Sequence, residues 1–563
     1  MNTVRYLLIL PFTLLAACSS QQAGDSDKPA MTDTAIATRA EAPLFEGLGE
    51  HQHRITTDQD AAQRYFDQGL ILDFGFNHAE SARSFRAAQK LDEDCAMCYW
   101  GEALALGPNI NVTSNGKAIM SDADRRQAYA AIQKAIALKS GASQEERDYI
   151  DALAARYNGD PSTPREPLDL AYVDSMRQLA QKYPRDDDAQ VLFAEAMMTT
   201  MPWNYWLDET SPKPGTVEVI DALETVMARN PDHPLALHLY IHAVEASSTP
   251  QRAEKAADNL AGLVPGSGHL VHMPAHIYWR VGRYNDASEA NIRAAKVDED
   301  YIAQCNAQGF YPALYYPHNI HFLWAASTME GRSELAIDSA RKVAGNVRLE
   351  QIREFPSVEF FHTIPMLALV QFGHWQEILQ EPEPPEGLDY SRAIRHYARG
   401  VAQARLGKLD QAHAEHDALV PLRDKATVHF LDSRDYPASS LLKIADDLLL
   451  GEIAMAEQDY ATAVDHFRAA VAEQDTLPYM EPPFWYYPTR QSLGMALLEA
   501  GQPAEAEAVY RRDLENYPRN GWSMYGLMQS LEAQNKTAEM QQVKHRFDDV
   551  WAHADVELSA SRL

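Results

Sequence analysis

The chain has 563 residues and a formal charge of −30, from 80 acidic and 50 basic side chains. Nucleic acids are therefore excluded as expected partners, because binding a phosphate chain requires clustered lysine and arginine. The length allows several domains or one long repeat array. A surface this acidic favours basic peptides, cations or simply solubility.

The N-terminus, MNTVRYLLILPFTLLAACSS, predicts a signal peptide over residues 1–17. Arg5 supplies the positive charge, and the apolar run after it is shorter than the roughly 20 residues that span a bilayer. The segment LAAC, which ends at Cys18, resembles the bacterial lipobox. The resemblance implies cleavage before Cys18 and a lipid on that cysteine. Ser19, where an inner-membrane lipoprotein would carry Asp, implies the periplasmic side of the outer membrane.

Residues 18–48 are rich in Ala, Thr, Asp and Ser and have no hydrophobic period. Such a segment cannot bury enough apolar surface to fold alone, so it predicts a disordered tether. The expected membrane contact is made through the lipid, since acyl chains contribute about 0.8 kcal/mol per buried CH₂.

A CxxC motif is formed by Cys95 and Cys98. In an oxidising compartment the two cysteines favour a disulfide. Buried thiols are an alternative, and zinc would need two further ligands. A redox site of the thioredoxin type follows a strand, and no strand is evident here.

The same small-and-large pattern recurs along the chain, as in GRYNDASEANIRAAKVDED from Gly282, GKLDQAHAEHDALVPL from Gly407 and GQPAEAEAVYRRDLENYPRN from Gly501. Each stretch follows another helical stretch. Small residues let the two helices approach closely, and large residues fill the groove of the next unit. Because one unit cannot bury its face alone, the units must stack.

These repeats resemble the tetratricopeptide repeat superfamily over most of residues 57–555, and more weakly over 140–230. The resemblance implies an all-α fold, an α-solenoid of helix-turn-helix repeats. CAMCYWGEALALGPN, HMPAHIYWRVGRY and YYPHNIHFL further resemble a family of bacterial repeat lipoproteins, a resemblance that brings no settled activity. We divide the array into N-terminal repeats (49–230), central histidine-rich repeats (231–385) and C-terminal repeats (386–563).

Prolines are expected to begin several central helices, because a proline at the first helical position loses no hydrogen bond. Pro234, Pro274 and Pro317 each precede histidines by one or two turns. This interpretation places His269 and His272 in the loop before the helix that starts at Pro274.

The histidine-rich units predict a candidate metal site. Two histidines four residues apart on a helix can bind one ion, and the first helices of successive units lie side by side. Helix N-termini disfavour imidazolium, and neutral imidazole is the form that binds zinc or copper. The candidate ligands are His238, His242, Glu245, His272, His276, His318 and His321.

Glu245 could ligate, orient a histidine or act as a base. Singly, however, histidines at helix starts are usually caps or satisfied packing residues, and no complete signature such as HExxH occurs.

The alternative use of the same surface is a peptide-binding groove. Arg280, Asn319 and Arg490 could hold a carboxylate or backbone amides, for which the planar guanidinium fork is suited. The sequence-based prediction is a periplasmic lipoprotein that binds a peptide or protein partner in its concave groove. The second hypothesis is a metal-binding protein or metal-dependent enzyme that uses zinc or copper. No motif identifies a catalytic residue, so enzymatic activity is left open.

Overall fold

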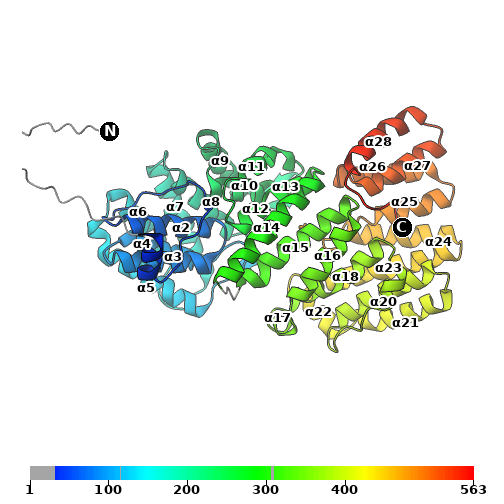
Figure 1. The fold of residues 1–563 in the computed structure, drawn as a ribbon, viewed down its shortest axis with the longest axis horizontal. Coiled ribbons are helices and arrows are strands. Elements are labelled where there is room, and N and C mark those ends of the chain that lie inside the picture. The colour runs from blue at the N-terminus through cyan, green and yellow to red at the C-terminus, as the bar shows by residue number, and fades with distance from the viewer. Residues whose placement is uncertain (1–31, 115, 306–309) are drawn as a thin grey trace, which may run out of the picture.

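The computed structural model describes residues 32–114, 116–305 and 310–563, and confirms an α-solenoid of tetratricopeptide-like helix pairs. Successive helices pack antiparallel along the chain, from the N-terminal units through the centre to the C-terminal units (Figure 1). The signal peptide and Cys18 lie outside the described residues.

The N-terminal units contain nine α-helices, one 3-10 helix (η1) and two short hairpins within the described chain. They are α1 (Asp33–Ala40), α2 (Asp60–Phe74), α3 (His78–Leu91), α4 (Ala96–Ala105), antiparallel β1 (Thr113–Ser114) and β2 (Lys117–Ala118), α5 (Asp122–Leu138), η1 (Lys139–Gly141), α6 (Gln144–Ala154), α7 (Arg165–Lys182), α8 (Asp187–Thr199), antiparallel β3 (Trp206–Asp208) and β4 (Ser211–Pro212), and α9 (Pro214–Arg229).

The central units carry the predicted histidines. They comprise α10 (Pro234–Val244), η2 (Pro250–Ala253), α11 (Glu254–Leu260), α12 (Gly268–His272), α13 (Pro274–Arg280), α14 (Tyr284–Cys305), α15 (Phe310–Met329), α16 (Ser333–Asn346), α17 (Leu349–Glu354), η3 (Pro356–Thr363), α18 (Ile364–Gln371) and α19 (Trp375–Ile378).

The C-terminal units complete the array. They comprise α20 (Asp389–Arg405), α21 (Leu409–Arg423), α22 (Ala426–Asp432), α23 (Ala438–Ala456), α24 (Tyr460–Gln474), α25 (Arg490–Glu499), α26 (Pro503–Asn516), α27 (Gly521–Ala533) and α28 (Thr537–Val550).

Aromatic side chains inserted between glycines hold the repeat units together. A Cβ atom added at Gly101 would lie 2.2 Å from the Phe85 ring, and one added at Gly69 would lie 2.9 Å from it. The pattern repeats at the other end of the chain, where Tyr510 lies between Gly494 and Gly526. The small-and-large pattern of the sequence therefore predicted the packing correctly.

The array closes on itself around the central units. Helix α10 packs against α2, which is far from it in sequence. From the other side, Trp522 Nε1 donates a hydrogen bond of 2.9 Å to the carbonyl oxygen of Thr328. Glu481, in the loop between α24 and α25, reaches His276. The opening turns of the central helices consequently face an interior that other parts of the chain cover.

Part of the predicted tether is wrong. Within residues 18–48, Asp33–Ala40 forms helix α1, which packs against α3. Ile36 and Ala40 are four residues apart and both are buried, so they form an apolar face that the compositional argument overlooked.

Two predicted helix starts also need correction. His269 and His272 lie in helix α12 and not in a loop, because Leu270 and Val271 bury their side chains and favour a helical turn before Pro274. Pro317 does not begin a helix but lies inside α15, which starts at Phe310. Pro234 and Pro274 begin α10 and α13 as expected.

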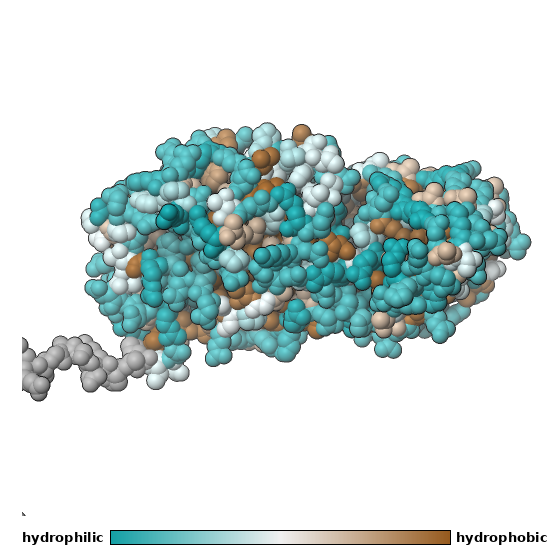
Figure 2. Space-filling model, turned by 90° about the horizontal axis from the view of Figure 1, so that it is seen from above, coloured by the Kyte–Doolittle hydropathy of each residue, from teal (hydrophilic) through white to brown (hydrophobic). Residues whose placement is uncertain are grey.

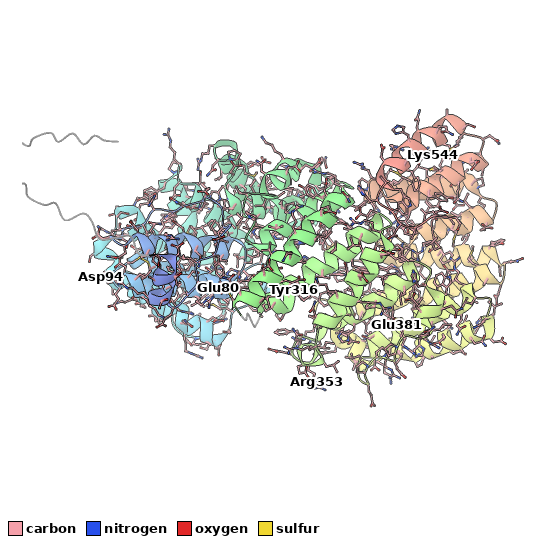
Figure 3. All side chains as sticks on the ribbon, viewed as in Figure 1. Glu80, Asp94, Tyr316, Arg353, Glu381 and Lys544 are labelled. Atoms are coloured by element: carbon pink, nitrogen blue, oxygen red, sulfur yellow. A yellow bond between two sulfur atoms is a disulfide. The ribbon has the colours of Figure 1, made fainter. Side chains whose placement is uncertain are left out.

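The face of the molecule seen in Figure 2 is predominantly hydrophilic, with smaller apolar areas between the polar residues. Charged side chains such as Asp94, Arg353 and Lys544 lie at the edges of the molecule (Figure 3). Among the described helices, none combines the length and apolar character needed to cross a bilayer.

Replacing Gly494 with alanine should destabilise the C-terminal units by about 1–3 kcal/mol, through overpacking. The new methyl group would lie 2.3 Å from the Tyr510 ring, which cannot swing freely because its hydroxyl bonds Ser561 at 2.7 Å. Chemical denaturation measures the loss. Gly345→Ala is the matched control, because a Cβ there meets no atom within 4 Å. Equal stability of the two variants would contradict the packing argument.

Candidate metal centre

Six histidines of the central units form two groups of three. The first triad is His238 and His242 from α10 and His269 from α12. The second triad is His272 at the end of α12, His276 in the first turn of α13, and His318 in α15. In each triad one nitrogen per ring lies within 4.8 Å of the other two, which is the arrangement that metal ligands need.

Hydrogen bonds fix the orientation of the rings in the first triad. His238 Nδ1 lies 2.7 Å from the carbonyl oxygen of Phe74, and His242 Nδ1 lies 2.8 Å from Glu245 Oε1. Both oxygens can only accept, so both Nδ1 atoms carry hydrogen and both Nε2 atoms present lone pairs. This pairing of a tethered Nδ1 with an available Nε2 is typical of metal-binding histidines.

The second triad is oriented in the same way. His276 Nδ1 lies 2.6 Å from Glu245 Oε2, and His272 Nδ1 lies 2.6 Å from Asn291 Oδ1. The amide of Asn291 is itself fixed, because its nitrogen donates to the carbonyl oxygen of Ala287 at 2.8 Å. The two Nε2 atoms of His272 and His276 face each other at 2.9 Å. A single cation between them, either a proton or a metal ion, satisfies both lone pairs.

Several nitrogens of the first triad have no hydrogen-bond partner within the described chain. They are His238 Nε2, His242 Nε2 and both ring nitrogens of His269. All three side chains are almost fully buried. Leaving a buried polar atom unsatisfied costs about 1–3 kcal/mol, and one such atom from each ring of this triad lies close to the other two, so the three rings form a site that a ligand or a water molecule would complete.

Charge around the two triads favours a cation. Burial lowers the pKa of His238, His242, His269, His272 and His318, so these rings are neutral and able to ligate.

His276 is different from the other five. Burial disfavours its charged form, but the carboxylates of Glu245 and Glu481 outweigh that effect and raise the pKa of His276 to about 10. Despite its burial, Glu245 has a pKa of about 2, because His276 and His242 stabilise its charged form. The point where the carboxylates and the second triad meet therefore favours positive charge.

Aromatic rings cover the two triads. Phe76 lies 4.5 Å from His238 and 5.4 Å from His269, measured between ring centroids. Phe322 lies 5.2 Å from His272 and 5.0 Å from His276. Phe76 adopts a left-handed backbone conformation, with φ of 56°. Such a conformation is unfavourable for a bulky residue and is kept where surrounding structure requires it.

The sequence-based ligand list is only partly reproduced by the geometry. His238, His242, His272, His276 and His318 come together. Glu245 orients two of these histidines through their Nδ1 atoms, which is one of the three roles considered for it.

His321 points elsewhere. Its ring packs against Trp324, Phe360 and Phe361.

Sequence reasoning missed His269 and Glu481. His269 is three residues before His272 and seven before His276, a spacing that places all three on one helical face. That signal was hidden because the helix was assumed to start at Pro274. Glu481 is more than 200 residues away in sequence, and no local pattern connects it to His276.

The three candidate groove residues are engaged by other residues of the chain. Arg280 donates to the carbonyl oxygen of Ser247 at 3.0 Å, and its guanidinium lies over the Tyr479 ring. The Asn319 side chain donates to Asp298 at 2.7 Å and is fully buried. Arg490 pairs with Asp475 through both terminal nitrogens.

A second histidine cluster, around Asp188, has a different pattern of hydrogen-bond donors and acceptors. Asp188 lies 2.6 Å from His53 Nδ1, 3.0 Å from His233 Nε2 and 3.2 Å from His51 Nε2. His233 Nδ1 accepts the backbone N–H of Ala236, so its Nε2 must carry hydrogen and donate to Asp188. This cluster therefore clamps the segment before α2 onto α8 and α10, and does not present a lone pair to a metal ion.

The predicted disulfide is present. Cys95 and Cys98 are bonded at the start of α4, and both are buried. Cys95 belongs to the apolar cluster that receives Ile36 and Ala40 of α1, so the bridge lies in the packing of the N-terminal units.

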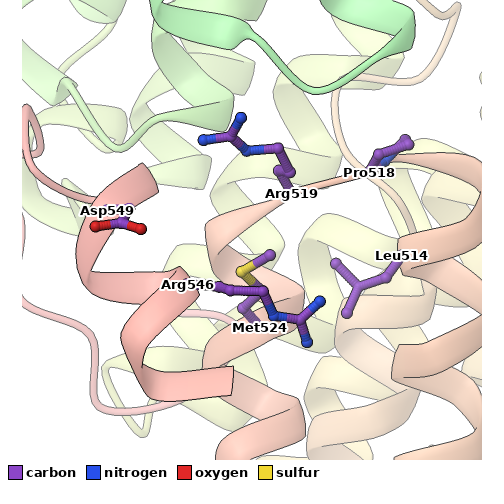
Figure 4. A pocket seen from close by; sticks show the side chains of 6 residues that line it. All are labelled: Leu514, Pro518, Arg519, Met524, Arg546 and Asp549. Atoms are coloured by element: carbon purple, nitrogen blue, oxygen red, sulfur yellow. The ribbon is translucent and has the colours of Figure 1, made fainter. Parts of the chain in front are cut away.

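A separate pocket of about 350 Å³ lies at the C-terminal end, between α26, α27 and α28 (Figure 4). Its charged side chains are Arg519, Arg546 and Asp549, all exposed. None of the candidate residues lines it.

Comparison with known proteins supplies no function. No protein family matches the sequence, and no curated protein matches it either. Solved structures similar to the chain include human IFIT1 in a dimer with m7Gppp-AAAA, at 11% identity over 86% of this chain and 96% of that one, with a TM-score of 0.31. Yeast Tom70 is 13% identical over 87% and 92%, with a TM-score of 0.29. The TPR domain of P58(IPK) is 12% identical over 84% and 99%, with a TM-score of 0.21.

Stability should depend on pH through the Asp188 clamp. Burial lowers the pKa of His53, but the carboxylate of Asp188, with smaller contributions from Asp186 and Asp67, outweighs it and raises that pKa to about 8. The unfolded value is 6.5. The ion pair therefore stabilises the fold fully below pH 6.5, and about 2 kcal/mol is lost as pH rises through 8.

Asp188→Asn should remove that decline, as measured by denaturation at pH 6 and pH 9. Asp549→Asn is the matched control, because Asp549 faces His545 at 3.6 Å in a largely exposed pair. If the Asp188 variant kept the wild-type pH slope, His53 would not be the titrating group.

Proposed function

We propose that this protein is a metal-binding protein whose two histidine triads hold zinc or copper. The observation that carries the proposal is the orientation of four imidazoles. His238, His242, His272 and His276 each have Nδ1 tethered to an acceptor, and their Nε2 atoms converge with the remaining two rings. A packing role would not require four rings to be tethered by the same nitrogen and to point the other one inward.

Imidazole nitrogens are ligands for zinc and copper, whereas magnesium and calcium prefer oxygen. The triads contain no thiolate and no carboxylate. Glu245 accepts hydrogen bonds from one histidine of each triad, so it orients both sites and raises the basicity of the ligands. Ligand identity thus supports zinc or copper, and the shared carboxylate supports joint occupancy.

Protein or peptide binding stays a second prediction. Exposed apolar side chains at Leu207 and Met480, with exposed fractions of 73% and 43%, favour some surface contact with a partner. Because Arg280, Asn319 and Arg490 are already bonded to other residues of the chain, a partner would use other positions of the array.

We expect protein purified without an affinity tag to contain zinc or copper. His242→Ala combined with His276→Ala removes one ligand from each triad and should abolish the metal. A chelator should lower the melting temperature of the wild type and leave the double variant unchanged, because a ligand at 100 times its Kd stabilises by about 2.7 kcal/mol.

The control is His545→Ala, since His545 is exposed and remote from the triads. Elemental analysis gives the stoichiometry. A wild type without metal that also fails to take up added zinc or copper would refute the metal centre.

The lipid anchor is likewise proposed. Cys18 follows a short apolar run in the lipobox pattern, and the acidic, mostly hydrophilic array is consistent with a periplasmic location on the outer membrane. Cys18→Ser should move the protein from the membrane fraction to the soluble fraction, because acyl chains alone would anchor it. Fractionation with Cys305→Ser as control tests this, and a Cys18→Ser variant that still sediments with membranes would disprove it.

A further inference from the structure

We infer that the two triads form one dinuclear copper centre that binds dioxygen between its metals. This inference rests on the metal centre proposed above and goes further in naming the metal pair and its small-molecule ligand. Four features of the described residues support it: the contact between the triads, their charge, their coordination number and their access to solvent.

The triads touch each other at two places. The ring centroids of His242 and His276 are 5.6 Å apart, and those of His269 and His272 are 5.8 Å apart. Glu245 connects the two triads, because its Oε1 accepts a hydrogen bond from His242 and its Oε2 accepts one from His276. Two ions held by these rings are therefore neighbours, as in two-metal sites, where the ions lie about 3.5–4 Å apart.

The buried charge favours two monovalent ions. With a metal bound, all six ligands would be neutral imidazoles, because the ion would replace the proton that His276 otherwise holds beside Glu245 and Glu481. Two copper(I) ions would bring two positive charges into this site. Two zinc(II) ions would bring twice that charge into the same buried site, which is more unfavourable.

Each triad supplies three protein ligands, which leaves a coordination position for a small molecule. The surroundings restrict what can enter. Phe76 and Phe322 lie against the rings, and the ring of Trp203, 39% exposed, lies 5.1 Å from His242. His318 is partly exposed, so solvent is close to the second triad. A small uncharged molecule suits these apolar surroundings better than an anion.

Two adjacent copper(I) ions can reduce dioxygen by two electrons. Each copper gives up one electron and becomes copper(II). The dioxygen molecule takes both electrons, keeps one oxygen–oxygen bond and becomes a peroxide bridging the metals. No other reductant is needed for this step, and release of hydrogen peroxide would require two protons.

The test is to load the wild-type protein with copper(I) in the absence of oxygen and then admit air. We expect two copper ions per chain and an intense near-ultraviolet absorption that appears only with oxygen. The oxidised sample should show no electron paramagnetic resonance signal, because the two copper(II) spins cancel through the bridge.

Each outcome decides a separate statement. Two coppers per chain without an oxygen-dependent absorption, or with the full signal of isolated copper(II), would overturn the oxygen-binding pair and leave the metal centre intact. One copper per chain would overturn the pair, and with it the oxygen-binding inference, and would leave the metal centre intact. A protein that binds neither copper nor zinc would overturn the proposed function as well.

Single-ligand variants sharpen the result. His238→Ala impairs the first triad and His318→Ala the second, so each should retain one copper and lose the oxygen-dependent absorption completely. His321→Phe is the matched control, because that ring packs among aromatic side chains outside both triads and should change neither property. The wild-type measurements decide the question even if a triad variant does not fold.

Discussion

The arrangement of the central units depends on one carboxylate that accepts two hydrogen bonds. Glu245 Oε1 and Oε2 lie 2.8 Å from His242 and 2.6 Å from His276, which belong to different helices and to different triads. Burying a carboxylate is costly unless it is paired and hydrogen-bonded. Here the imidazoles provide that pairing, and the carboxylate in turn fixes which nitrogen of each ring is available. A packed interior that holds this charge must keep α10 and α13 in one relative position, so a single side chain orients one ring in each triad.

Closure of the array gives the centre its environment. An open solenoid would expose the first turns of its helices to solvent along one face. In this chain α2 packs against α10 from the N-terminal side, and the loop that carries Glu481 approaches from the C-terminal side. The carbonyl of Phe74, the ring of Phe76 and the carboxylate of Glu481 are consequently contributed by units distant in sequence. The central repeats therefore surround a closed interior and not an open groove. Hydrogen bonds and charges in that interior act at low dielectric.

The fold was predictable because its signal is local. Glycine and aromatic positions recur within each helix pair, and the structure places Phe85 and Tyr510 between those glycines. Five of the six triad histidines were also predictable, from their positions at or near the starts of successive central helices. The failures have non-local or cooperative causes. His269 was missed because the helical segment was assumed to start at Pro274. In the structure the short helix α12 directly precedes it and carries His269. His321 was included because it is three residues from His318, a spacing that permits a shared helical face. In the structure its ring packs instead against Phe361. Glu481 depends on closure of the whole array, which no local pattern records.

Composition alone does not distinguish the triads from the cluster around Asp188, since both gather buried histidines beside a carboxylate. Hydrogen-bond direction does. His233 accepts the backbone N–H of Ala236 on Nδ1 and donates from Nε2 to Asp188. Both of its ring nitrogens are therefore hydrogen-bonded within the protein. His238 donates from Nδ1 to a carbonyl and has Nε2 left with no partner among the described residues. The first pattern completes a clamp, and the second leaves a lone pair that a metal ion could use. The tautomer imposed by the backbone therefore separates a histidine that holds the fold together from one that is positioned to bind a metal ion.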